Sequence, residues 1–247
     1  MKIVAIIPCR YDSKRFRGKP LMAVHGKPLV QWVYERAKQT GLVSHVVVAT
    51  DDERIFRLVE GFGGQALMTA PHHRSGSDRV AEAAVKLGLQ NEDVVINIQG
   101  DQPAFDPRCL LEIVSPLRQD PAIDMSTLIY RIKDAHEVKD PNCVKCVFDN
   151  DGFALYFSRS PIPLNRDASA PCDVFKHLGI YAFRKRFLDC FASLPQGRLE
   201  EIEKLEQLRV LEHGYRIKVL ETRYDSRAVD TPDDIEKLEA VLGKGAC

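Results

Sequence analysis

A run of basic residues near the start of the chain carries the clearest chemical signal. It follows the apolar segment 3–7 and consists of cationic side chains within a single predicted loop: Arg10, Lys14, Arg15, Arg17 and Lys19. Most runs of this kind are solvated surface loops. Here Pro8, Gly18 and Pro20 would shape the backbone, so that several cations can gather around one small polyanion. We therefore expect the loop to bind a nucleoside triphosphate.

The loop is not one of the familiar phosphate-binding motifs. Gly18 and Lys19 are followed by Pro20 rather than by Ser or Thr, and the upstream glycine of a P-loop is missing. The glycine cluster at 61–64 closes a predicted helix instead of following a strand, so a helix C-cap explains it. The sequence therefore predicts neither a P-loop nor a dinucleotide-binding fold.

Two aspartates follow β-type segments at places where a metal could bind. Asp101 comes after the buried run 93–99, and ligands of open α/β sheets bind beyond the carboxyl ends of the strands. A carboxylate there suits Mg²⁺, which takes one or two carboxylates together with substrate phosphates. A turn aspartate before Pro103 is the alternative that the residues leave open. Asp230 has a spare carboxylate if Thr231 caps the following helix, and is otherwise the cap itself.

Other polar residues after strands have a structural explanation. Asp51 and Asp52 both precede a predicted helix, and N-capping accounts for them. Ser75 or Ser77 is expected to cap the next helix. These positions therefore need no catalytic role on the residues alone.

Strand alternation groups a second set of polar residues. In the segment 175–183, one face carries Leu178, Ile180 and Ala182, and the other carries Phe175, His177, Gly179 and Tyr181. A lone histidine is more often structural or solvated than functional. The planar guanidinium of Arg159, however, suits a carboxylate ligand. We expect His177 and Tyr181 to share a face opposite the aliphatic one.

The segment 199–213 is predicted to form one helix. Its buried stripe recurs at helical spacing and consists of Ile202, Leu205, Leu208 and Leu211. Glu206 and Gln207 lie beside this stripe, where an exposed helix face is the simplest explanation for them.

The elements that position these residues alternate between strands and helices. Apolar runs at 3–7, 45–50, 65–69 and 93–99 predict strands, and the segments 28–40, 53–60 and 77–87 between them predict helices. Strands that are apolar on both faces and separated by helices are typical of a doubly wound α/β fold with a mostly parallel sheet. Between about 125 and 183, strands follow one another across turns, which predicts an inserted antiparallel subregion. A strand at 216–220 and a helix from Pro232 complete a single domain over residues 1–247.

The composition excludes several classes of protein. Basic and acidic residues are equal in number, 35 each, which argues against a protein that binds nucleic acid. No apolar run approaches the length of a membrane span, and the apolar N-terminal stretch is too short for a signal peptide. Seven scattered cysteines suit free thiols in a reducing compartment, and Cys143 and Cys146 would point to opposite faces of a strand. We therefore expect a cytoplasmic protein without a membrane partner.

Several motifs together resemble those of a known enzyme family. The loop RYDSKRFRGKPL at 10–21 looks like the signature loop of the sugar nucleotidyltransferases. The later motifs lie at 75–79, 99–103, 156–159, 161–163, 177–181, 205–209 and 229–232. In order along nearly the whole chain, they resemble the 3-deoxy-manno-octulosonate (Kdo) cytidylyltransferases. The resemblance implies a fold of the nucleotide-diphospho-sugar transferase type.

The resemblance also implies an activity and a set of site residues. The family activates Kdo, an acidic eight-carbon sugar of lipopolysaccharide, with CTP and Mg²⁺ to give CMP-Kdo and pyrophosphate. It implies that Arg79 is free to face the nucleotide. The nucleotide would contact Arg10, Ser13, Arg15, Lys19, Ser75, Arg79 and Asp101. The sugar would contact Gln99, Arg159, His177, Tyr181, Glu206 and Gln207. Asp101 and Asp230 would hold the metal, and Arg10, Lys19, Asp101 and Asp230 would carry the catalysis.

Some alternatives stay open. Gln102 stands where the family more often carries Glu, so the sugar is either Kdo or its 8-amino analogue. A sister enzyme acting on a sialic acid is the nearest rival, and a nucleotide-binding regulator without catalytic activity is the alternative from another class. We expect a homodimer, with the subregion at about 125–183 binding the sugar and serving as a candidate for the dimer contact.

Overall fold

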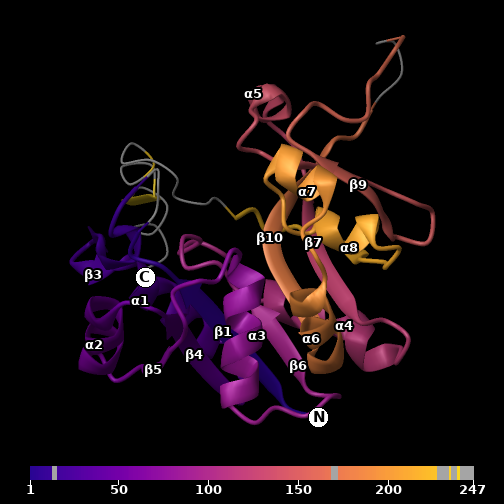
Figure 1. Ribbon diagram of the computed structural model, residues 1–247. Helices are drawn as coiled ribbons and strands as arrows, with labels where there is room; N and C mark the ends of the chain where they lie inside the picture. The colour runs from indigo at the N-terminus through magenta and orange to yellow at the C-terminus, as the bar shows by residue number, and fades with distance from the viewer. Residues whose placement is uncertain (13–15, 168–171, 227–233, 235–237, 240–247) are drawn as a thin grey trace.

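The computed structural model describes residues 1–12, 16–167, 172–226, 234, 238 and 239, and its main feature is one mixed β-sheet (Figure 1). The strand order is β11-β7-β10-β6-β1-β4-β5, and β8 pairs with β10 and β9. The strands span Ile3–Cys9 (β1), His45–Thr50 (β4), Gln65–Met68 (β5), Val94–Asn97 (β6), Met125–Arg131 (β7), Lys145–Phe148 (β8), Ala154–Ser158 (β9), Phe175–Arg184 (β10) and Lys218–Glu221 (β11). A short ladder joins β2 (Ala23–Val24) to β3 (Lys27–Pro28).

The pairing confirms the predicted fold class. Strands β6, β1, β4 and β5 run parallel to one another, and β11 runs parallel to β7. Strand β10 runs antiparallel to β6, β7 and β8, and β8 and β9 form an antiparallel hairpin. The antiparallel insertion is therefore real, although β7 itself keeps the direction of the parallel strands.

Helices cover both faces of the sheet, as the two-sided apolar strands require. Alternate residues of β1 enter two different cores: Ala5 and Ile7 pack on one face, and Val4 and Ile6 pack on the other. The first core is completed by α1 (Leu29–Lys38), α2 (Glu53–Gly61) and α4 (Cys109–Gln119). The second is completed by α3 (Gly76–Lys86), α6 (Lys185–Ser193) and α8 (Leu208–Glu212). None of the helices in the described ranges is both long and apolar enough to cross a membrane.

The predicted helix at 199–213 is wrong as a single element. The structure has two short helices, α7 (Arg198–Glu203) and α8, with Lys204 between them in the left-handed region at φ 55°. Ile202, expected in the buried stripe, is 64% exposed, whereas Leu205 and Leu208 are buried. The break matters because it places Glu206 and Gln207 in a turn rather than on a helix face.

Some expectations fall outside the described residues. They concern Ser13, Arg15, Asp230 and the helix expected from Pro232. The short helix η1 (Lys19–Leu21) that ends the basic loop is described: Gly18 precedes it with φ 72°, and Pro20 lies in its first turn. The backbone N–H of Gly18 donates to the carbonyl of Tyr11 at 2.8 Å, which closes the loop.

The two aspartates after β4 have different roles. Asp52 caps α2, as predicted, by accepting a hydrogen bond from the backbone N–H of Arg54 at 2.9 Å. Asp51 does not fit the predicted capping role, because its carboxylate accepts a 2.7 Å hydrogen bond from Nη2 of Arg79. Arg79 is fully buried on α3 and also donates to the hydroxyl of Thr69. Asp51 is thus the charge partner that makes a buried arginine tolerable.

This difference predicts unequal losses of stability. Asp51→Ala would leave the guanidinium of Arg79 buried without a counter-charge, so we expect the free energy of unfolding to fall by about 3 kcal/mol. Asp52→Ala removes only a helix cap and should cost about 1 kcal/mol. Urea unfolding of the two variants measures both values. Equal, small losses would show that the Arg79–Asp51 pair is not needed for folding.

Candidate active site

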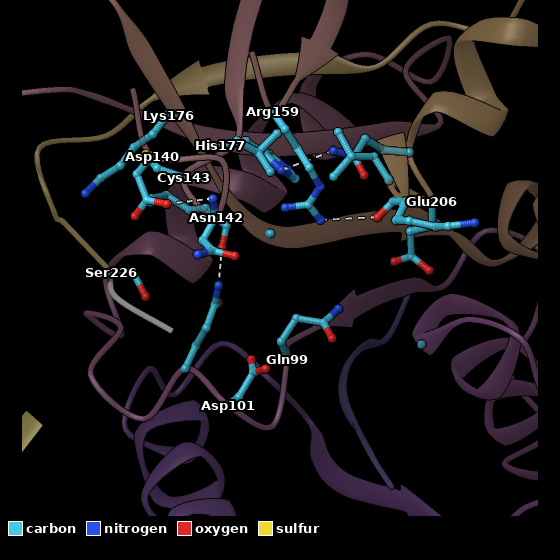
Figure 2. A pocket seen from close by; sticks show the side chains of 18 of the residues that line it. Gln99, Asp101, Asp140, Asn142, Cys143, Arg159, Lys176, His177, Glu206 and Ser226 are labelled. Carbon is cyan, nitrogen blue, oxygen red and sulfur yellow. Dashed lines mark hydrogen bonds between the residues drawn. The ribbon is translucent and has the colours of Figure 1, made fainter. Parts of the chain in front are cut away.

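A cleft of about 1100 Å³ opens beyond the carboxyl ends of the parallel strands (Figure 2). Its walls come from the loop after β6, the start of α3, the strand β10 and the α7–α8 turn. Eight of the described residues predicted for the site line it: Ser75, Gln99, Asp101, Arg159, His177, Tyr181, Glu206 and Gln207. The structure therefore brings together residues that are far apart in the sequence.

Arg10 directly follows β1 and has an unusual environment. Its Nη2 atom is buried and has no hydrogen-bond partner among the described residues. Burial and the nearby charge of Arg79 lower the pKa of Arg10, while the carboxylates of Asp51 and Glu206 act in the opposite sense. A buried cationic donor without a partner is rare in native proteins. An anionic ligand at this end of the sheet would satisfy it.

Lys19 and Asp101 form an ion pair between the basic loop and the loop after β6. Lys19 Nζ lies 2.8 Å from Oδ2 of Asp101. The lysine side chain is 10% exposed, whereas that of Asp101 is 34% exposed and lines the cleft. The pair fixes the end of the basic loop against the sheet and leaves the carboxylate accessible.

Arg79 corrects one expectation. The resemblance implied that this side chain is free to face a nucleotide, but it is fully buried and paired with Asp51. The charge of Arg79 helps to lower the pKa of Arg10, so the two guanidinium groups lie near each other. Arg79 is not among the described residues that line the cleft.

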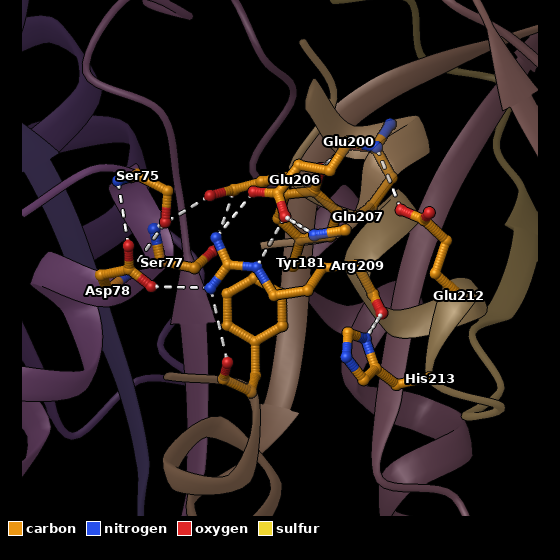
Figure 3. Close-up of polar contacts among 12 residues, drawn as sticks. Ser75, Ser77, Asp78, Tyr181, Glu200, Glu206, Gln207, Arg209, Glu212 and His213 are labelled. Atoms are coloured by element: carbon orange, nitrogen blue, oxygen red, sulfur yellow. Dashed lines mark hydrogen bonds and ion pairs between the residues drawn. The ribbon is translucent and has the colours of Figure 1, made fainter. Parts of the chain in front are cut away.

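The start of α3 holds Glu206 in place (Figure 3). Ser75 caps the helix in a capping box with Asp78. The carboxylate of Glu206 accepts hydrogen bonds from the hydroxyl of Ser77 at 2.9 Å and from its backbone N–H at 3.2 Å. Burial raises the pKa of Glu206, and the hydrogen bonds from Ser77 and Ser75 oppose this shift. Asn97 donates to the same Ser77 hydroxyl at 3.0 Å, so the Ser77 proton points at Glu206.

Arg209 ties the α7–α8 turn to α3 (Figure 3). Its guanidinium binds Glu200 of α7 through two hydrogen bonds, of 2.8 and 2.6 Å, and Asp78 of α3 through one of 3.1 Å. Both Arg209 and Glu200 are buried. Residue 209 belongs to the motif at 205–209, but the motif implies no function for it. The contacts in the structure show that Arg209 holds the turn that carries Glu206 and Gln207.

His177, Tyr181 and Gln207 meet on one side of the cleft, which confirms the predicted shared face. The two rings are 5.3 Å apart. Gln207 accepts from the hydroxyl of Tyr181 at 3.1 Å, and its Nε2 lies 3.4 Å from Nδ1 of His177. Burial lowers the pKa of His177 from 6.5 to about 3 and raises that of Tyr181, to which the charge of Glu206 also contributes. Both side chains are therefore uncharged at neutral pH.

Arg159 lies across the cleft from Asp101 (Figure 2). Its guanidinium donates to the carbonyls of Glu203 at 2.7 Å, Pro141 at 2.8 Å and Lys204 at 3.4 Å. Carbonyl oxygens fix the orientation of the group without neutralising it. Since a guanidinium has five N–H donors, one N–H on each terminal nitrogen is left for a ligand by these contacts.

No sequence pattern predicts the residues at the far end of the cleft. There Lys176 pairs with Glu137 at 2.7 Å and with Asp225 at 2.8 Å, and Asp140 lies nearby on the cleft wall (Figure 2). These residues come from three separate segments, so no local pattern marks them. The buried Asn97, in contrast, could have been found as the polar residue inside an otherwise apolar strand.

Comparison with known proteins gives a consistent result at the level of sequence. A family profile described as cytidylyltransferase matches residues 4–218. A 3-deoxy-manno-octulosonate cytidylyltransferase from Desulfosudis oleivorans is 56% identical over 100% of this chain and 99% of its own length. An 8-amino-3,8-dideoxy-manno-octulosonate cytidylyltransferase from Shewanella sp. strain ANA-3 is 52% identical over 98% of this chain and 99% of its own.

Solved structures agree with these relatives. CMP:2-keto-3-deoxy-manno-octonic acid synthetase complexed with CTP matches with a TM-score of 0.91 and 42% identity, covering 99% of this chain and 100% of that one. A 4-diphosphocytidyl-2C-methyl-D-erythritol synthase shares the fold alone, with a TM-score of 0.66 and 13% identity over 98% of both chains. The chain therefore belongs to the 3-deoxy-manno-octulosonate cytidylyltransferase family.

Proposed function

We propose that the protein transfers the cytidylyl group of CTP to the anomeric hydroxyl of Kdo. A bond forms between the anomeric oxygen and the α-phosphorus, the bond from that phosphorus to the bridging oxygen of the β-phosphate breaks, and pyrophosphate leaves with the electron pair. The hydroxyl loses its proton to solvent in the same step. The observation that carries the proposal is the Nη2 atom of Arg10, which is buried without a hydrogen-bond partner among the described residues, together with Arg159 on the cleft lining. Arg10 would bind the anionic nucleotide, and Arg159 would bind the acidic sugar.

The nucleotide end is assigned to Arg10 and Lys19, together with Ser75 at the start of α3. The N-terminus of that helix adds a favourable field for negative charge. Arg79 does not line the cleft, and it would act on the nucleotide only through its positive charge, from a position near Arg10. Ser13 and Arg15 belong to the same proposed set but lie outside the described residues. The role of these groups is to hold the phosphates in line for attack and to offset charge.

The sugar end is assigned to the opposite wall. Arg159, with its remaining N–H groups, suits the sugar carboxylate. The hydroxyls would be bound by the neutral and acidic groups of that wall, namely Gln99, His177, Tyr181, Glu206 and Gln207. Because burial keeps His177 uncharged, its role is binding and not proton transfer at neutral pH.

Magnesium fits the residues of the nucleotide end. Within the described ranges no group of three or more His, Cys, Asp or Glu residues could hold a metal ion. Mg²⁺ does not need one, because it retains water and binds one or two carboxylates together with substrate phosphates. Asp101, accessible on the cleft wall, is one such carboxylate, and Asp230 is the proposed second. The ion would orient the α-phosphate and offset its charge.

We also infer that the chain acts as a single domain over residues 1–247 and as a homodimer. The hairpin β8–β9 supports a contact between copies, since β9 pairs with β8 alone among the described strands and exposes Leu155 by 61%. An exposed apolar side chain on an edge strand favours association. Analytical ultracentrifugation of the wild type and of Leu155→Lys tests this assignment.

The activity is tested by pyrophosphate release with CTP, Mg²⁺ and one acid sugar at a time. We expect rapid turnover with Kdo and none with N-acetylneuraminate, because the relatives at 56% and 52% identity are named for eight-carbon sugars. The 8-amino analogue is the informative third substrate, since relatives named for it are nearly as similar. Turnover with the 8-amino sugar alone would move the substrate assignment, and no release with any sugar would favour a regulator.

The basic loop offers a matched pair of substitutions. Lys19→Ala and Arg10→Ala should each lower kcat/KM by at least a hundredfold, because each removes a cation assigned to the phosphates. Arg17→Ala is the control and should leave turnover within twofold, since the exposed Arg17 side chain contacts exposed Asp12 and the Tyr11 ring. Equal effects of all three substitutions would contradict a specific role for Arg10 and Lys19.

The metal assignment predicts a loss that Mg²⁺ cannot simply restore. Asp101→Asn keeps the size of the side chain and removes its charge, so we expect kcat to fall by orders of magnitude and the Mg²⁺ dependence to shift to higher concentration. Asp106→Asn, on the same loop but bound to Arg108 at the surface, serves as the control. Near-normal turnover of Asp101→Asn at limiting Mg²⁺ would exclude the residue as a ligand.

A further inference from the structure

Strand β10 is irregular where it crosses the cleft. Its register against β7 shifts between His177 and Tyr181, and Gly179 within this bulge has φ 71°. Thr127 of β7 is fully buried at this point. Its hydroxyl contacts two groups of β10: the carbonyl oxygen of Ile180 at 2.7 Å and Nε2 of His177 at 2.8 Å.

These two contacts determine where the protons lie. A carbonyl oxygen can only accept a hydrogen bond, so the single proton of the Thr127 hydroxyl is directed to Ile180. The hydroxyl oxygen can then only accept from His177. The Nε2 atom of the ring must therefore carry a proton, and the backbone carbonyl thereby decides the tautomer of a histidine that it does not touch.

The directions of the hydrogen bonds are also determined on the other side of the His177 ring. His177 is neutral because burial lowers its pKa to about 3, so a ring protonated at Nε2 has a lone pair at Nδ1. Gln207 must turn its Nε2 toward that lone pair, at 3.4 Å. Its Oε1 is then on the side of Tyr181, whose hydroxyl donates to it at 3.1 Å. Every hydrogen bond in the series thus has one direction.

We propose that Thr127 is a positioning residue for the sugar wall of the cleft, which fixes the tautomer of His177 and thereby the orientation of the Gln207 amide. The proposal rests on the assignment of Gln207 to the sugar. With its amide fixed, Gln207 has one N–H and one carbonyl lone pair that these contacts do not use. A sugar hydroxyl both donates and accepts, so this pair of groups is complementary to hydroxyls in a defined order along the wall.

Without the Thr127 hydroxyl, the directions of these hydrogen bonds are no longer determined. The ring could then take its proton on Nδ1, and Gln207 would present Oε1 to it and Nε2 to Tyr181. The donor and the acceptor offered to the sugar would exchange places. The cost would fall on sugar binding, whereas the nucleotide end, which is built on other elements, would be unchanged.

The test uses two variants of Thr127 and one matched control. Thr127→Val keeps the shape of the side chain and removes the hydroxyl, and Thr127→Ser restores the hydroxyl in a smaller side chain. Ser126→Ala is the control, because Ser126 is the buried neighbour on β7 whose hydroxyl donates to the carbonyl of Ile113 at 2.6 Å. This hydroxyl binds a carbonyl of α4, on the face of the sheet opposite His177.

Two measurements follow the effect at its two ends. Nitrogen-15 NMR of the histidine side chains reports the tautomer of His177 in the protein without substrate, with His177→Gln used to assign the signal. We expect protonated Nε2 in the wild type and in Thr127→Ser, and a mixture of tautomers in Thr127→Val. In steady-state kinetics, Thr127→Val should raise the KM for Kdo about five- to tenfold, as the loss of one ordered hydrogen bond would. The KM for CTP should stay within twofold, and Ser126→Ala should change neither quantity.

The outcomes separate this proposal from the proposed function. A wild-type ring protonated on Nδ1, or a Thr127→Val variant with an unchanged tautomer, would overturn the positioning role whatever the substrate is. A changed tautomer with an unchanged KM for Kdo would also overturn it, because the tautomer of His177 would then have no effect on sugar binding. If Kdo is not a substrate at all, the proposed function fails, while the NMR result still decides the tautomer.

Discussion

The buried guanidinium of Arg209 joins the two walls of the cleft, and the geometry of the site depends on it. One side chain of α8 binds Glu200 of α7 and Asp78 of α3, and it also lies 4.4 Å from the ring centre of Phe191. Burial alone would lower the pKa of Arg209, but its hydrogen bonds to Glu200 and the charge of Asp78 raise it. Removing one partner of such a pair leaves an uncompensated buried charge and costs about 3 to 5 kcal/mol. The α7–α8 turn is therefore held against α3, where Glu206 meets Ser77.

The direction of a single strand then explains why both substrates can share one edge of the sheet. Parallel strands β1 and β6 end at this edge: Arg10 directly follows β1, and Asp101 lies in the loop after β6. Strand β10 runs the opposite way, with Tyr181 opposite Asn97, so its early residues, His177 among them, lie at the edge where the parallel strands end. A parallel strand in that place would present only its final residue and the loop after it. The reversed strand instead offers a rigid wall of alternating side chains.

How far the sequence predicts this site depends on whether a residue acts through local or distant contacts. Ser75 and Asp52 follow capping rules that need only a few neighbouring residues, and the shared face of His177 and Tyr181 follows from strand alternation; both expectations are confirmed. Asp51 looked like a second cap because its true partner, Arg79, is 28 positions away. No glycine or proline in the sequence indicates the break at Lys204. It arises because tertiary contacts of Arg209 and Glu206 override the helical periodicity there.

Gln102 shows how the bulge in β10 is maintained. Two residues of the irregular stretch of that strand present carbonyl groups to side chains from other segments: Ile180 accepts from Thr127, and Leu178 accepts from Nε2 of Gln102. Gly179 lies between them, and a Cβ atom there would come within 3.3 Å of the same Gln102 nitrogen. A glutamate at position 102 could donate to the Leu178 carbonyl only if it were protonated, because a carboxylate has no hydrogen to give. The amide at this position is thus matched to the strand: it satisfies one carbonyl of the bulge while Thr127 satisfies the other, and together they hold His177 and Tyr181 on the same wall despite the shift in register.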